Sequence, residues 1–162
     1  ARKGSVVAHC PTSNACLNSG IMSLDEVIAH QIDYAICSDV GASPTTSLAA
    51  EMAVFLLAHR GRSRHATACE ALYRTTLGPA KVLGIDSSCG HFAVGGQAVW
   101  AEWPKPNAGP NASAEEWLQW LLLPRHQTDP LPAGILELPN LQNWIAARRS
   151  EPMLKPLRVR KA

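Results

Sequence analysis

The stretch SVVAHCPTSNACLNSGIMSLDEVIAHQIDYAICSDVG, residues 5–41, decides the fold. Residues 5–8 are short and apolar and predict a buried strand, which Pro11 ends because proline lacks the N–H that a strand ladder needs. The sequence Ser-Leu-Asp-Glu at 23–26 is a capping box and predicts the start of a helix. Residues 33–37 predict a second strand that is mostly apolar. Strand, helix and strand in this order indicate a βαβ unit with parallel strands.

Further helices are predicted in the sequence that follows this βαβ unit. Thr46 or Ser47 can cap a helix over about 48–59, whose apolar residues at i, i+3 and i+4 predict one side facing the core. A second capping box at 67–70 begins another helix, and a further short helix ends at Gly84.

The pattern then changes from helical to extended. Residues 91–103 hold two extended stretches around Gly-Gly at 95–96, which predicts a β-hairpin. The proline-rich residues 104–110 predict a stiff linker. A third capping box, Ser-Ala-Glu-Glu, begins a helix with a Trp/Leu face over about 113–123. Apart from the linker and this helix, we interpret residues 104–162 as a proline-rich, divergent tail.

Composition and charge exclude several classes of protein. The chain has 162 residues, of which 46% are hydrophobic and 17% charged, which fits one globular domain with an apolar core. The sequence shows neither a membrane-spanning run nor a secretory signal, so we expect a soluble, cytoplasmic protein without a membrane partner. The net charge is +2, and the basic tail over 148–162 lacks a nucleic-acid reading motif, so we do not expect nucleic-acid binding. The five cysteines include no C-x-x-C pair, which argues against a disulfide framework or a cysteine zinc site.

Two polar residues follow the predicted strands at the edge where parallel βα folds place their ligands. Asp39 comes after the second strand, and a carboxylate buried there needs a hydrogen-bond partner or a cation. His9 comes at the end of the first strand and is expected on the same face, where imidazole can accept a hydrogen bond or bind a metal. Both residues also have structural interpretations: Asp39 as a turn cap and His9 as a buried hydrogen-bonding group.

The sequence around these residues resembles a known family. The segments VAHCPTSN (7–14) and AICSDVG (35–41), at this separation, resemble the late part of the metal-dependent amidohydrolase superfamily, in its guanine deaminase, chlorohydrolase and adenosyl-homocysteine deaminase branch. Residues 72–84 and 90–98 are similar to the helix and hairpin by which such enzymes return to their small β-domain. The resemblance covers about 5–103.

The resemblance implies a role for each of these residues. Asp39 corresponds to the eighth-strand aspartate, which in the family binds the metal and carries a proton from water to the leaving nitrogen. It is therefore the predicted catalytic residue and metal ligand. His9, Val40, Gly41 and Ser43 are predicted to line the substrate site. The implied cofactor is a divalent metal, zinc or iron, and the implied substrate is a small heterocycle whose C–N bond is hydrolysed.

Much of the family pattern lies outside this sequence. Its H-x-H motif and the histidines of its fifth and sixth strands are missing, whereas a catalytic zinc takes about three protein ligands. We therefore predict an α/β fold comprising the last two βα units of a TIM-type (β/α)8 barrel (1–90), a hairpin of the small domain (91–103) and the tail (104–162).

The predicted function is that of the C-terminal part of a deaminase-like hydrolase. This part alone is incomplete and is expected to hold no metal by itself. Its expected partner is the rest of the barrel, on the same chain or on another. The alternatives left open are a non-catalytic remnant, or a subunit that only completes a partner barrel. Because two barrel strands leave apolar edges uncovered, we also expect the chain alone to associate or to be marginally stable.

Overall fold

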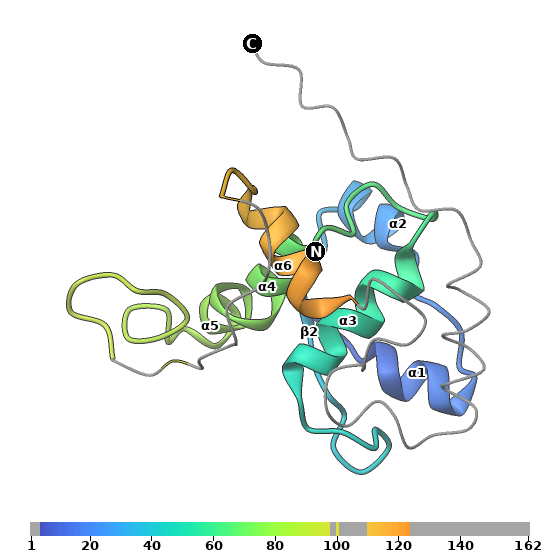
Figure 1. Ribbon diagram of the computed structural model, residues 1–162. Helices are drawn as coiled ribbons and strands as arrows, with labels where there is room; N and C mark the ends of the chain where they lie inside the picture. Colours follow the sequence, from blue (N-terminus) through green and yellow to red (C-terminus); the bar gives the residue numbers. More distant parts are fainter. Residues whose placement is uncertain (1–3, 98–99, 101–109, 124–162) are drawn as a thin grey trace.

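The computed structural model describes residues 4–97, 100 and 110–123, shown in colour in Figure 1. Its elements, in chain order, are β1 (Val7–His9), α1 (Pro11–Leu17), α2 (Leu24–Ala29), β2 (Tyr34–Ile36), α3 (Leu48–His59), α4 (Ala68–Thr75), α5 (Leu77–Leu83) and α6 (Ala114–Leu122).

The two strands confirm the predicted parallel βα arrangement. β1 pairs with β2 in parallel, with Val7 opposite Tyr34 and His9 opposite Ile36. The ladder continues for one step, because the Cys37 amide donates to the His9 carbonyl at 2.9 Å. Both strands therefore end at the same edge, and the segments that follow them begin side by side.

Helix α1 was not predicted. Pro11 does end the strand, but it also occupies the first turn of α1, where its fixed φ suits a helix and its missing N–H costs nothing. The helix ends at Asn18, which adopts the left-handed conformation (φ 52°) that asparagine tolerates. The sequence H-C-P-x-S-N thus forms a strand end, a proline and a first helical turn.

Helix α3 forms the centre of the molecule, and its bounds confirm the predicted range 48–59. Figure 1 shows it between α1 and α2 on one side and α4 to α6 on the other. Every residue from Ala50 to His59 is buried, so the prediction of a helix with only one core-facing side is wrong. The reason is that α1, β2, α4 and α6 pack around it, and a helix surrounded in this way has no solvent side.

Helix α4 is fixed to β2 by a polar cluster under an aromatic ring. The Glu70 carboxylate accepts from the Tyr34 hydroxyl at 3.0 Å and from Arg74 Nε at 2.8 Å. The Arg74 guanidinium also lies 4.2 Å from the centre of the Tyr34 ring. The Thr67 hydroxyl caps the helix by accepting from the Glu70 amide. The Glu70 carboxylate therefore bonds to Tyr34 and Arg74 and does not accept from the Thr67 amide, which is the second hydrogen bond of the predicted capping box.

Helix α6 packs on α3 and α4, and the predicted helix over about 113–123 is confirmed. Its complete capping box joins Ser113 and Glu116. Leu122 of this helix is buried in the hydrophobic core, so the surface that α6 covers is that core. Glu115 accepts from the amides of Ala68 and Cys69, both at 2.7 Å, and so caps the amino end of α4.

Two local predictions are not confirmed. Ser23 occupies the cap position of α2, but its side chain makes no capping hydrogen bond. In the predicted hairpin, residues 91–97 form turns and no strand, and the Gln97 amide donates to the Ser88 carbonyl instead. Of residues 98–103 the structure describes only 100. A two-stranded hairpin is at best marginal without a sheet to extend, and β1 and β2 are the strands of the described part.

The linker predicted over 104–110 lies outside the described residues except for 110, and the basic tail over 148–162 lies wholly outside them. No helix of the described part is long and apolar enough to cross a membrane.

Candidate functional site

The edge where β1 and β2 end holds the candidate site, and Asp39 lies in the turn after β2. Its backbone is left-handed (φ 55°), a conformation that Asp adopts more readily than most residues and that is frequent at functional sites. The Asp39 carbonyl accepts from the amides of Ala42 and Ser43, at 3.0 and 2.8 Å, which closes the turn. The turn therefore fixes the direction in which the Asp39 side chain leaves the strand.

Ser13, on the first turn of α1, holds the Asp39 carboxylate. Its hydroxyl donates to Asp39 Oδ2 at 2.6 Å, across 26 residues of sequence. Ser13 is buried, whereas Asp39 is exposed, so the expectation of a buried carboxylate at this position is wrong. The exposure leaves the carboxylate accessible to a ligand approaching the edge.

The buried carboxylate of this region is Glu51, which the sequence analysis did not select. It lies in the first turn of α3 and is fully buried. Its Oε2 accepts from the Thr12 amide and its Oε1 accepts from the Ser43 hydroxyl, both at 3.1 Å. Burial raises the pKa of Glu51, the hydrogen bonds from Thr12 and Ser43 offset this only in part, and the Asp39 carboxylate raises it further.

The predicted loop residues lie around Asp39. Val40 is exposed and forms an isolated bridge with Ser43, and Gly41 has a positive φ of 111° that its lack of a side chain permits. Ser43 thus contacts Asp39 through its backbone and Glu51 through its side chain. The loop is placed to shape whatever binds at Asp39.

His9 has a different environment from Asp39, although both follow strands that end at one edge. Its ring is buried against α3, where His9 Nε2 lies 3.1 Å from His59 Nε2, so one ring donates and the other accepts. The rings of His9 and His59 both contact Phe55, with centroids 5.9 and 4.9 Å away. His59 was predicted only to suit the end of its helix, because sequence alone does not show which strand residue it will meet.

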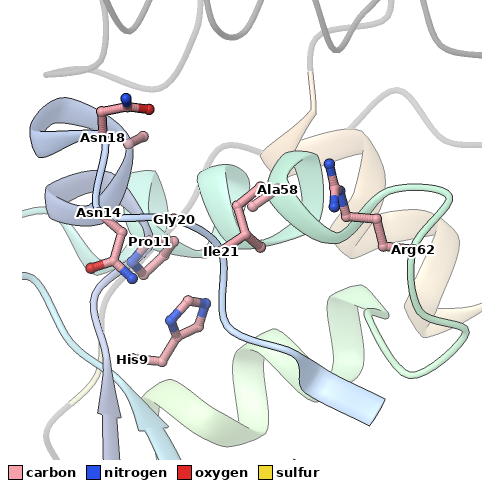
Figure 2. A pocket seen from close by; sticks show the side chains of 9 residues that line it. His9, Pro11, Asn14, Asn18, Gly20, Ile21, Ala58 and Arg62 are labelled. Atoms are coloured by element: carbon pink, nitrogen blue, oxygen red, sulfur yellow. The ribbon is translucent and has the colours of Figure 1, made fainter. Parts of the chain in front are cut away.

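His9 also lines a pocket of about 430 Å³, which Figure 2 shows between α1, the segment after it and the end of α3. The polar lining includes Asn14, Asn18 and Arg62, and Ile21 contributes an apolar side. Asp39 is not among the lining residues. The two predicted site residues therefore face separate spaces in this chain.

The buried histidine pair predicts a loss of stability in acid. Burial, and to a lesser extent the neighbouring His59, lowers the pKa of His9 to about 4, whereas an unfolded histidine titrates near 6.5. The stability gained by keeping His9 neutral is complete above pH 6.5 and is lost as the pH falls towards 4, because the unfolded chain then binds the additional proton. At 1.36 kcal/mol per pH unit this amounts to about 3 kcal/mol. Urea unfolding at several pH values measures it.

The matched control for this prediction is His30→Gln, since His30 is exposed. We expect His30→Gln to leave the steep acid dependence unchanged and His9→Gln to flatten it between pH 6.5 and 4. Equal slopes in the wild type and in His9→Gln would contradict the prediction.

A complete metal site is not formed by the residues described. Within them, no three His, Cys, Asp or Glu side chains are grouped so as to hold an ion. Asp39, with its carboxylate fixed by Ser13 and exposed at the edge, fits one oxygen ligand. A catalytic zinc takes about three protein ligands, so the described part does not fit the metal without further donors.

Comparison with known proteins shows what this arrangement is similar to. Residues 1–116 match the sequence profile described as "Amidohydrolase family". The chain is 32% identical over 99 residues to guanine deaminase of Mus musculus, which is 57% of this chain and 22% of that protein. It is 38% identical over 106 residues to the probable guanine deaminase of Deinococcus radiodurans, 64% of this chain and 24% of that protein.

A solved structure agrees with these matches. E. coli guanine deaminase superposes with a TM-score of 0.60 and 30% identity, covering 75% of this chain and 30% of that one. The chain thus spans less than a third of the length of the proteins it matches.

Proposed function

Because the chain belongs to the amidohydrolase family, we propose that it is the C-terminal part of a metal-dependent deaminase that hydrolyses a C–N bond on a purine-like heterocycle. The observation that carries the proposal is the family match over residues 1–116, which includes Asp39 and the loop after it. The guanine deaminases among its relatives favour guanine, or a close analogue, as the substrate.

In this proposal β1 and β2 are the seventh and eighth strands of the barrel. The parallel pairing and the helix after each strand support this assignment. The open edge of β1 then meets the sixth strand, so the partner of this part is the remainder of the barrel. The further metal ligands come from that remainder.

Asp39 is the residue of this chain that we propose as catalytic. The metal that amidohydrolases usually hold would supply Lewis acidity and activate a water, and Asp39 would contribute one of its ligand oxygens. The Asp39 carboxylate would take up a proton from the water and pass it to the nitrogen that leaves as ammonia. Ser13 holds Asp39 Oδ2, which orients the carboxylate for this transfer. Val40, Gly41 and Ser43 line the substrate side of the same turn, and His9 supports the adjacent strand end.

A chimera tests this function with a complete barrel. The segment of E. coli guanine deaminase that matches this chain is replaced by the residues of this chain, and the product is assayed for metal by elemental analysis and for ammonia release from guanine. We expect stoichiometric metal and turnover of guanine or a related purine. The chain alone, assayed in parallel, is expected to bind metal substoichiometrically and to be inactive.

Two outcomes contradict the proposal. A chimera that melts cooperatively and holds metal but releases no ammonia from any purine would exclude a deaminase role for this part. A folded chimera without metal would show that Asp39 does not complete the site, and would favour a non-catalytic subunit or remnant.

A further inference from the structure

Glu51 connects the two segments that hold Asp39. Through Oε2 it accepts from the Thr12 amide, and Thr12 precedes Ser13, which donates to the Asp39 carboxylate. Through Oε1 it contacts the Ser43 hydroxyl, and the Ser43 amide donates to the Asp39 carbonyl. One buried side chain on α3 therefore joins the start of α1 to the turn after β2, and Asp39 lies between them.

The hydrogen bonds around Ser43 tie Glu51 to the loop after Asp39. The Ser43 hydroxyl donates to Glu51 Oε1 at 3.1 Å and lies 3.2 Å from the Thr45 carbonyl, and it accepts from the Thr45 amide at 3.4 Å. Both carboxylate oxygens of Glu51 therefore accept a hydrogen bond, one from each segment that contacts Asp39.

The burial of Glu51 makes these hydrogen bonds important. Both ion pairs of the described residues involve Arg74, so no lysine or arginine of that part pairs with Glu51. A fully buried carboxyl group has a high cost in free energy without hydrogen-bond partners, so its bonds to α1 and to the turn after β2 hold both segments in place.

We propose that Glu51 is a positioning residue for Asp39, accepting one hydrogen bond from the Thr12 amide at the start of α1 and another from the Ser43 hydroxyl in the turn after β2. The role of Asp39 rests on the proposed function, whereas the hydrogen bonds of Glu51 do not. Glutamine keeps the size of glutamate and can still contact both segments, because its carbonyl accepts from the Thr12 amide and its own amide donates to the Ser43 oxygen. Leucine has a similar size and can do neither.

The first experiment uses the chain itself and needs no activity. Hydrogen exchange is measured at the amides of Ala42 and Ser43, which donate to the Asp39 carbonyl, and at the Ala71 amide in α4 as the reference for global opening. We expect Glu51→Leu to speed exchange at Ala42 and Ser43 by at least about 10-fold relative to Ala71, which corresponds to a local loss of about 1.4 kcal/mol. Glu51→Gln is expected to restore most of the protection. Glu26→Gln, on an exposed glutamate, is the matched control.

The remaining outcomes are also decisive. Unchanged exchange at Ala42 and Ser43 in Glu51→Leu would overturn the positioning role, as would a glutamine variant no better protected than the leucine variant. If Glu51→Leu does not fold, Ser43→Ala removes one of the two links. Exchange is then compared at the Ala42 amide only, where we expect it to be several-fold faster; no change would count against the proposal. In the active chimera, Glu51→Leu is expected to lower kcat about 10-fold with little change in KM, and Glu51→Gln to recover it. An inactive chimera with the predicted exchange pattern would refute the proposed function and leave this inference standing.

Discussion

In the chimera, Asp39→Asn lowers kcat for deamination by about 10²–10⁴-fold, the range that a single general acid–base group contributes. Asparagine has nearly the shape of aspartate and its oxygen still accepts from the Ser13 hydroxyl, so the turn after β2 keeps its structure. What is lost is the capacity to take up and release a proton and the negative charge that a divalent cation requires. Metal content is expected to fall together with kcat, measured by elemental analysis and steady-state assay.

The control for this prediction is Asp33→Asn. Asp33 precedes β2, is mostly exposed and contacts Arg74 only at 3.4 Å. An exposed ion pair of this kind contributes little, so the rate and metal content of Asp33→Asn are expected to match those of the parent chimera. An Asp39→Asn protein that keeps full metal and more than about a tenth of the parent kcat would contradict the catalytic assignment.

Phe55→Ala destabilises the chain by about 3–5 kcal/mol, the cost of removing a large aromatic side chain from a packed core. Phe55 is fully buried in the middle of α3 and stacks on Tyr34 with centroids 6.4 Å apart. It also contacts the rings of His9 and His59, so its removal leaves a cavity beside two buried imidazoles. A small domain has only about 5–15 kcal/mol of total stability, so much of the variant is expected to unfold at 37 °C.

Thermal and urea unfolding measure this loss, with Phe92→Ala as the matched control. The Phe92 side chain is 88% exposed, so its removal should change stability by less than about 0.5 kcal/mol. A loss below about 1.5 kcal/mol in Phe55→Ala would show that the core around α3 rearranges to fill the cavity.

The sequence predicted those elements of the fold that depend on local signals. The helix over 48–59 and the helix near 113–123 were predicted from their caps and apolar patterns, because these signals lie within the element itself. Helix α1 was missed, because Pro11 was interpreted only as the end of a strand. The strand predicted over 91–94 does not form, and residues 91–97 adopt turns instead, because the strand propensity of a segment depends on its surroundings.

The candidate site was predicted in part, for a related reason. Asp39 follows a strand, and this position in a βα unit is visible in the sequence, whereas Ser43 was predicted from the family resemblance. Glu51 and His59 lie inside an apolar helical pattern, where a single polar residue is usually taken to face solvent. Their importance arises from contacts 8 to 50 residues away along the chain, which no local pattern reveals.

The carboxylate of Glu115 at the start of α4 has a consequence for how the protein is made. On the ribosome, α4 emerges well before α6, and until then the amides of Ala68 and Cys69 have only water as a partner. Leu122, which α6 adds to the core, arrives later still. A nascent chain that has not yet reached residue 115 therefore has a weaker α4. A chain truncated before residue 115 is therefore expected to be cleaved by proteases within α4 faster than the longer chain.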